Sequence, residues 1–115
     1  MAGITIARIV EAVAAEHHVA PEALVLPSDC PGARQRCFAW PRQEAMALSR
    51  DLVTTPHCDG EHRIAATLPM IGRKFGGRDH ATVIHACRAV AERRRTDPEV
   101  HRRLVRLTRE LIGGR

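Results

Sequence analysis

Apolar residues recur along most of this chain at the three- and four-residue spacing of amphipathic helices. The spacing predicts a first helix that Thr5 caps and that runs to about His17. Its apolar face comprises Ile6, Ile9, Val10 and Val13. A second, short helix is predicted to begin at Pro21, because proline is favoured at the first helical position, and to end before Pro27. We find no convincing strand, so the pattern predicts an all-helical single domain.

The middle of the chain is expected to alternate between loops and one helix. Two prolines, a glycine and a Ser-Asp pair predict a basic loop over residues 27–40. Pro41 is expected to open a third helix over 41–53, because proline suits the first helical turn. The polar stretch 54–67, which contains Pro56 and Gly60, is expected to be an exposed connection.

The last third predicts three more helices. A short helix over 68–75 is broken by Gly76-Gly77 and followed by a longer helix over about 79–95. The longer helix has an inner face of Val83, Ile84, Cys87 and Val90. A final helix begins near Pro98 and ends at Gly113-Gly114, and its stripe is Val100, Leu104, Leu107 and Leu111. Residues 68–95 therefore form a candidate helix-turn-helix.

The basic composition of the chain suggests nucleic acid as a partner. The chain has 115 residues, the size of one domain, and a net charge of +5. Every basic residue except Lys74 is arginine, whose planar fork suits phosphates and guanine edges. Nucleic acid is therefore a candidate partner, and the alternative is a solvated basic surface that meets no partner.

The sequence gives no sign of a membrane protein. No apolar stretch is long enough to cross a bilayer, and the N-terminus lacks the features of a signal peptide. We expect a cytoplasmic, nucleoid-associated protein in which Cys30, Cys37, Cys58 and Cys87 are mostly reduced.

One segment carries a specific resemblance. LPMIGRKFGGRDHATVIHACR, residues 68–88, resembles the signature of the C-terminal DNA-binding domain, domain IV, of the bacterial replication initiator DnaA. AWPRQEAMALSRDL resembles the ARPRQ segment of that family and the helix that follows it. ITIARIVEAVAAEHHVAPEAL is similar to its opening helices. Nearly the whole chain, 1–115, is covered, whereas the ATP-binding domain of the initiator has no counterpart.

The resemblance implies a Trp-repressor-like helix-turn-helix fold that binds double-stranded DNA at DnaA boxes as a monomer, without a cofactor. Asp79 and His80 match family residues that contact bases, Ala81 stands where threonine is usual, and Thr82 is kept. The other residues that the resemblance assigns to DNA binding are Arg34 in the minor groove, Arg36, Arg42, Gln43, Arg50, Leu68 and Pro69. Trp40 replaces an arginine, and the 54–67 connection is longer than in the family.

The residue types suit these roles. A carboxylate can accept from the cytosine amino group, and alanine or threonine methyl groups can contact the thymine methyl. An arginine in an irregular basic loop can enter a narrow A·T-rich minor groove. Backbone N–H groups at the start of the 68–75 helix suit phosphate. Further phosphates are expected to meet Arg42, Arg50, Arg73 and Arg78.

Structural roles compete with these assignments. Asp79 can act as an N-cap, alone or together with a base contact. His85 and Cys87 are expected to pack in the core, and Trp40 either packs on the core or stacks near the DNA backbone. The arginine runs 93–95 and 102–103 are expected to be solvated helix faces.

Zinc binding and catalysis are weaker alternatives. Cys30 and Cys37 with His57, Cys58 and His62 supply zinc-ligand types, but not at the spacing of a zinc finger or ribbon. A helix over 41–53 would also hold the two groups apart. No nucleophile elbow, phosphate-binding glycine loop or HExxH pattern is present, so we expect neither an enzyme nor a metal site.

The leading hypothesis is a stand-alone, sequence-specific binder of duplex DNA that regulates replication or transcription. The helix placed directly after Met1 favours a natural short protein. The alternative is a protein-interaction module on the same fold, with Trp40 and the 54–67 connection forming the surface for a replication or regulatory protein. A third possibility is DNA binding with a target altered by Ala81 and Trp40.

Overall fold

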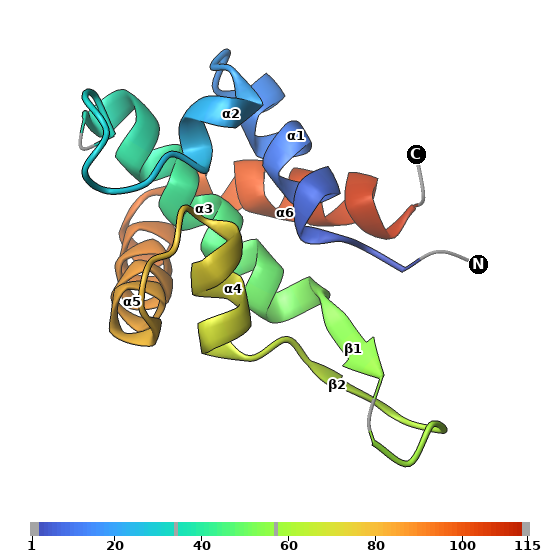
Figure 1. The fold of residues 1–115 in the computed structure, drawn as a ribbon. Coiled ribbons are helices and arrows are strands. Elements are labelled where there is room, and N and C mark those ends of the chain that lie inside the picture. Colours follow the sequence, from blue (N-terminus) through green and yellow to red (C-terminus); the bar gives the residue numbers. More distant parts are fainter. Residues whose placement is uncertain (1–2, 34, 57, 114–115) are drawn as a thin grey trace.

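The computed structural model describes residues 3–33, 35–56 and 58–113, which form six helices and one two-stranded hairpin (Figure 1). The helices are α1 (Ile6–Glu16), α2 (Pro21–Leu24), α3 (Arg36–Leu52), α4 (Leu68–Lys74), α5 (His80–Thr96) and α6 (Pro98–Ile112). The strands are β1 (Thr54–Pro56) and β2 (Arg63–Ala65). The prediction of a mainly helical fold is confirmed.

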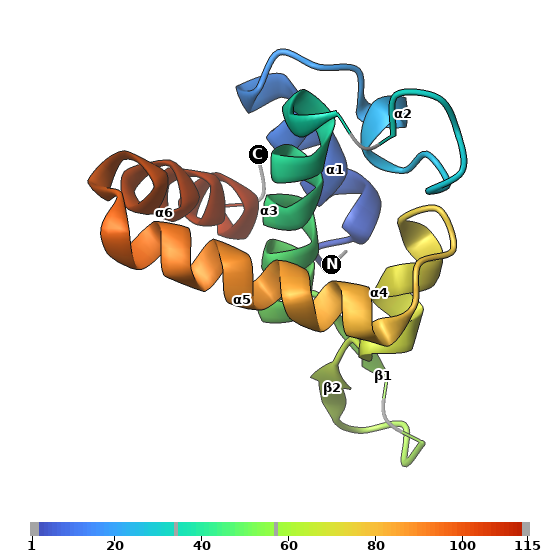
Figure 2. The same cartoon turned by 90° about the vertical axis from the view of Figure 1, so that its left-hand side faces the viewer.

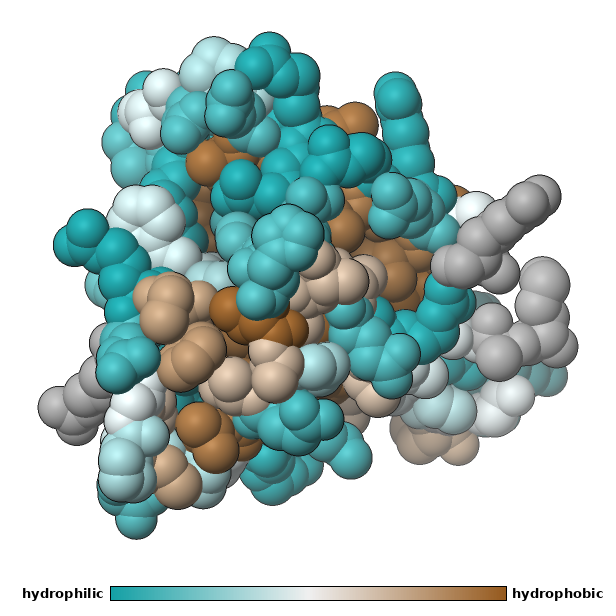
Figure 3. Space-filling model, turned by 90° about the horizontal axis from the view of Figure 1, so that it is seen from above, coloured by the Kyte–Doolittle hydropathy of each residue, from teal (hydrophilic) through white to brown (hydrophobic). Residues whose placement is uncertain are grey.

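The other helices pack around α3. α5 crosses in front of α3 and α1 lies behind it, while α6 contacts both α1 and α5 (Figure 2). Each helix contributes aliphatic side chains to a single core, and Phe75 adds one buried aromatic ring. Hydrophilic residues surround smaller apolar patches on the upper face (Figure 3). The largest fully buried apolar side chains are Phe75, Ile9, Leu24, Met46, Ile71, Leu104, Leu107, Val13 and Val83.

Several predicted helix starts are confirmed by their capping contacts. Thr5 Oγ1 accepts a hydrogen bond from the Arg8 N–H at 3.2 Å, which satisfies one of the unpaired donors at the start of α1. Pro21 is the first residue of α2. The Asp97 carboxylate accepts from the Glu99 N–H at 3.0 Å and caps α6.

The predicted start of the third helix is wrong. α3 begins at Arg36, so residues 36–40 are helical and Pro41 lies inside the helix. The carbonyl of Gln35 accepts from the N–H groups of Phe38 and Ala39, which closes the first turn before the proline. Pro41 costs one intrahelical hydrogen bond, and its ring is buried. The loop in front of α3 therefore ends at Gln35.

The 54–67 connection is not entirely irregular, because β1 and β2 pair antiparallel within it. Arg63 donates to Oγ1 of Thr54 at 2.7 Å and to its carbonyl at 2.8 Å, which fastens the open end of the hairpin. Asp59 turns the chain by accepting from the N–H groups of Glu61 and His62. Strands of three residues with few apolar side chains give no periodic signal in the sequence.

Two expectations about α5 also change. His85, expected to pack, is exposed, because the buried face of α5 consists of Val83, Ala86 and Val90. Cys87 is half-buried against the core.

A buried carboxylate joins three helices. Glu44 of α3 is fully buried and accepts from His17 Nε2 at 2.9 Å and from Arg103 Nε at 3.2 Å. Arg103 was expected to be solvated, and its ion pair with Glu44 corrects this expectation. Burial alone would raise the pKa of Glu44, but the hydrogen bonds from His17 and Arg103 lower the pKa below its usual value. Glu44 is therefore ionised at neutral pH and ties α1 and α6 to α3.

We predict that Glu44→Gln lowers the free energy of unfolding at pH 7 by about 3 kcal/mol, because it removes one partner of a buried ion pair. Since the folded pKa lies below the unfolded one, the carboxylate stabilises the fold above about pH 4.3. This contribution is lost as the pH falls through the folded pKa. Urea unfolding should show a smaller difference in unfolding free energy between the unmodified protein and Glu44→Gln at pH 3.5 than at pH 7. The exposed pair of Glu92 and Arg95 supplies the control, Glu92→Gln, and equal losses in both variants would contradict the prediction.

Candidate nucleic-acid interface

The helix-turn-helix is formed by α4, the turn 75–79 and α5. Gly76 and Gly77 have φ values of 79° and 77°, in the left-handed region that favours glycine. The turn also approaches α4 closely, since the Arg78 N–H donates to the Gly72 carbonyl at 2.9 Å. A Cβ atom at Gly72 would lie 2.0 Å from the Arg78 carbonyl oxygen. The glycine at this position therefore sets how closely α5 can follow α4.

The N-terminus of α5 is capped and exposed. Asp79 Oδ1 accepts from both the N–H and the hydroxyl of Thr82, at 2.9 Å each. These hydrogen bonds lower the pKa of Asp79, so the side chain is a carboxylate at neutral pH. The capping role is confirmed, and the carboxylate has a second oxygen that can accept from a base. His80 and Ala81 are exposed beside it, and their contact with bases remains a prediction.

Arg42 does not lie on the surface as predicted. Its side chain is only 6% exposed, and it donates from Nε to the Leu24 carbonyl at 3.2 Å and from Nη2 to the Ala33 carbonyl at 2.6 Å. Burial, with a smaller effect from the charge of Arg78, lowers the pKa of Arg42 to about 10. Two of its three guanidinium nitrogens are used on backbone carbonyls, which gives Arg42 a structural role, and its phosphate contact stays a prediction.

Arg78 is also bound to backbone. Its Nη1 donates to the Leu26 carbonyl at 2.6 Å and to the Phe75 carbonyl, and burial lowers its pKa. A Cβ atom at Gly76 would lie 2.5 Å from the same Leu26 oxygen. Arg78 is half-buried and has this structural role, and its phosphate contact stays a prediction. Arg42 and Arg78 together hold the segment 24–33, which we call the clasped loop, against α3 and the helix-turn-helix.

Other predicted contacts lie around this unit. Arg50 is exposed and donates to the Ala66 carbonyl at 2.7 Å, just before α4. Pro69 is exposed and Leu68 is half-buried. Thr67 Oγ1 accepts from the Met70 N–H, and proline has no N–H, so the start of α4 offers fewer free donors for phosphate than expected.

At the start of α3, two arginines contact the ring of Trp40. Trp40 is 42% exposed, so it does not pack in the core as expected. The Cζ atoms of Arg36 and Arg93 lie 5.4 and 4.5 Å from the centroid of its ring. Arg93 is not solvated as predicted but half-buried, and it donates to Gln43 Oε1 at 2.9 Å.

The clasped loop and α5 lie on the same side of the molecule, whereas the hairpin and both chain ends lie on the other (Figure 1). Trp40 lies near the first end of α3, and the hairpin follows its last residue, Leu52. The twelve-residue separation corresponds to about 18 Å along a helix. Trp40 and the hairpin therefore lie at opposite ends of α3. Arg34, the predicted minor-groove arginine, lies outside the described residues.

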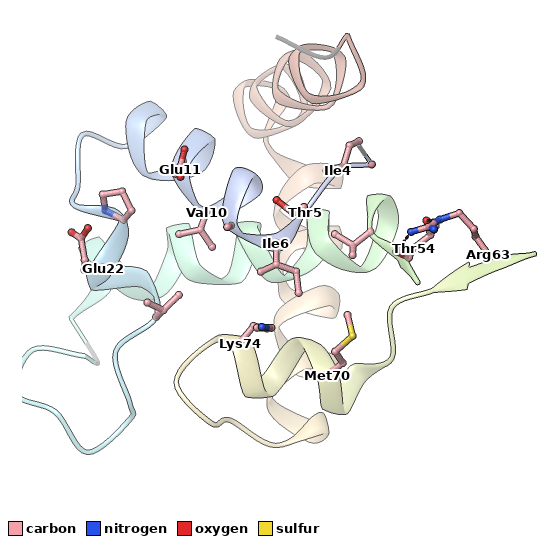
Figure 4. Close-up of a pocket in the computed structure, with 15 residues that line it drawn as sticks. Ile4, Thr5, Ile6, Val10, Glu11, Glu22, Thr54, Arg63, Met70 and Lys74 are labelled. Carbon is pink, nitrogen blue, oxygen red and sulfur yellow. Dashed lines mark hydrogen bonds between the residues drawn. The ribbon is translucent and has the colours of Figure 1, made fainter. Parts of the chain in front are cut away.

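A groove of about 560 Å³ lies between α1, α2, α4 and the hairpin, away from α5. Ile6, Val10 and Met70 contribute its apolar lining (Figure 4). Charged side chains from three helices stand around it, and these are Glu11, Glu22 and Lys74.

The described part of the chain contains no group of three His, Cys, Asp or Glu side chains placed to hold a metal ion. His57, one of the zinc ligands considered, lies outside that part. No disulfide joins any of the four cysteines, which all lie in the described ranges. None of the helices in the described ranges is long and apolar enough to cross a membrane.

A seven-residue helix, a glycine turn and a longer helix with an exposed, capped N-terminus define a helix-turn-helix of the DNA-binding class. The chain belongs to the family described as "Bacterial dnaA protein helix-turn-helix", whose model matches residues 6–90. The chain is thus a DNA-binding domain of the DnaA domain IV type.

Similar proteins include chromosomal replication initiator proteins DnaA from three bacteria. The protein from Laribacter hongkongensis is 46% identical over 69 residues, 60% of this chain and 12% of that protein. The Caulobacter sp. protein is 44% identical over 80 residues, covering 70% and 14%. The Symbiobacterium thermophilum protein is 39% identical over 95 residues, covering 83% and 17%. The chain therefore spans less than one fifth of the length of these relatives.

We predict that Gly72→Ala costs about 3 kcal/mol of unfolding free energy, because the new methyl group meets a main-chain oxygen that cannot move away alone. Gly77→Ala is the matched control. Its methyl group points into open space, so only the positive φ opposes it, at about 1 kcal/mol. Urea unfolding of the two variants checks the difference, and equal losses would show that the close approach is unimportant.

We predict that Arg42→Lys lowers both stability, by about 1–2 kcal/mol, and affinity for duplex DNA. Lysine keeps the charge but cannot bond both carbonyls with a planar fork, so buried acceptors lose their partners. The exposed Arg73 supplies the control, because Arg73→Lys should leave unfolding unchanged. Unaltered stability of Arg42→Lys in urea would mean that the clasped loop does not need this side chain.

Proposed function

We propose that this domain binds double-stranded DNA sequence-specifically at sites resembling DnaA boxes, as a monomer. The observation that carries the proposal is the exposed N-terminus of α5, where Asp79 and His80 directly follow Arg78, the residue that bonds the clasped loop. Recognition helices present their base-reading residues at this end. The family membership supports the same role.

The proposed contacts divide by chemistry. Asp79, His80, Ala81 and Thr82 read base edges in the major groove, where each base pair has its own pattern of donors and acceptors. Arg34 enters the adjacent minor groove. Phosphate contacts come from Arg36, Gln43, Arg50 and the start of α4 at Leu68 and Pro69, and these fix the register of the domain on the duplex.

This assignment gives Arg42 and Arg78 a part in DNA binding besides the phosphate contacts that the sequence predicted. Both remain positively charged at neutral pH and hold the clasped loop beside α5. Their charges add to the positive field that attracts DNA.

We further propose that the protein regulates replication or transcription by occupying such sites, where it competes with the initiator itself. A protein with this function acts at the nucleoid. The initiator relatives are named for chromosomal replication, which supports a target among initiator binding sites.

Protein binding is a second candidate, favoured by the groove between α1, α2, α4 and the hairpin. The groove and the exposed Ile64 of β2 lie away from α5, so a partner there would leave the DNA side open. This candidate differs from DNA binding in one measurable way. A protein that uses only the groove binds neither a box duplex nor a scrambled one.

We predict that His80→Ala lowers the preference for a box duplex over a scrambled duplex by about 10- to 100-fold, the value of one lost base contact. Weak binding to the scrambled duplex should remain, because phosphate contacts supply it. Fluorescence anisotropy at two salt concentrations measures both affinities. His85→Ala is the control, since His85 is exposed on the same helix but lies five residues further along.

Equal affinity of the unmodified protein for the two duplexes would refute sequence-specific binding. If box preference is weak in every variant, selection from a random duplex pool reports whether Ala81 has shifted the target. An enriched motif different from the box would support altered recognition on the same side of the molecule.

A further inference from the structure

Trp40 is the only tryptophan of the chain, and the structure leaves it substantially exposed. Two guanidiniums lie against its ring, that of Arg36 at 5.4 Å and that of Arg93 at 4.5 Å from the centroid. Both distances are within the range in which a cation is attracted to the face of an aromatic ring. The ring thus joins the first turn of α3 to the later part of α5.

The Arg93 side fixes the position of the ring. Nε and Nη2 of Arg93 are buried and have no hydrogen-bond partner within the described residues. Its Nη1 donates to Gln43 Oε1, so the guanidinium cannot turn freely to find another partner. The indole ring and the charge of the nearby Glu44 carboxylate both offset part of the lost hydration of this cation. Moving the ring away would leave a half-buried cation poorly solvated.

Unlike Arg93, Arg36 is exposed and contacts the ring from the first turn of α3. Arg36 is the first residue of α3, directly after Gln35, and its side chain is exposed. The ring of Trp40 is the contact that the structure gives it. Arginine otherwise samples many rotamers, and ordering such a side chain at an interface costs free energy. A ring that already holds the guanidinium reduces this cost.

We propose that Trp40 is a positioning residue for DNA binding, which holds the Arg36 guanidinium in place to contact the DNA backbone. Through Arg93 the same ring also supports Gln43, the other predicted phosphate contact on α3. The proposal rests on the proposed function, because Arg36 must meet DNA for its position to matter. It also accounts for a tryptophan at a position where the resembling family has an arginine.

A double-mutant cycle tests the proposal, with the affinities of the unmodified protein, Arg36→Ala, Trp40→Leu and the double variant measured for a box duplex. Leucine keeps apolar cover over Arg93 but offers no aromatic face. Trp40→Leu should weaken binding about two- to five-fold, the size of one exposed cation–π contact. Arg36→Ala should weaken binding. It should also make the slope of log affinity against log salt concentration shallower by about one. In the double variant, the Arg36 change should have a smaller effect than it has beside Trp40.

Trp40→Phe is the matched rescue, because phenylalanine restores a ring face and should restore most of the coupling. Thermal unfolding of every variant identifies any loss of fold. Independent, additive effects of Arg36→Ala and Trp40→Leu in folded variants would overturn the proposal.

His80→Ala, measured beside these variants, separates this proposal from the proposed function. If His80→Ala removes box preference while Trp40→Leu binds as the unmodified protein does, the positioning role alone is wrong. If the unmodified protein binds neither duplex, both the proposed function and the positioning role are wrong.

Discussion

The hydrogen bonds from two arginines to backbone carbonyls set the geometry on which the DNA-binding side depends. Arg42 bonds the carbonyls of Leu24 and Ala33, and Arg78 bonds that of Leu26. Beyond Leu24, the last residue of α2, the clasped loop is in no helix or strand, and side chains from α3 and from the turn before α5 hold it. Arg78, which lies in the turn before α5, therefore links the clasped loop to the helix-turn-helix.

Because Arg42 and Arg78 hold the clasped loop with charged side chains, they place two positive charges close together. Burial lowers the pKa of both guanidiniums, and that of Arg42 falls to about 10, which still leaves it protonated at neutral pH. Two like charges close together oppose folding, and a polyanion bound nearby relieves that repulsion. Binding of DNA and ordering of the clasped loop should therefore stabilise each other. Through this linkage we expect Arg42→Lys to affect affinity by way of the clasped loop.

The sequence predicted much of what local rules decide, although the local rule for proline misplaced the start of α3. It missed what distant partners decide. The cap at Thr5, the start at Pro21 and the glycine turn follow from short-range backbone chemistry, and all three are confirmed. Arg42 is buried because carbonyls nine and eighteen residues away accept from it. Glu44 is buried because its partner Arg103 lies fifty-nine residues further along. No periodicity marks such pairs, so arginines in the family pattern were expected on the surface, and the hairpin strands were too short to be recognised.

Mapping the contact surface directly on isotopically labelled protein is the most direct test of the central claim. A box duplex added in steps should shift the backbone amide resonances of residues 78–82 at the start of α5 and those of the clasped loop and the first turn of α3. Resonances of the hairpin and of the α1 residues that line the groove should stay in place. Shifts confined to the hairpin and the groove, with residues 78–82 unchanged, would contradict DNA recognition through the helix-turn-helix.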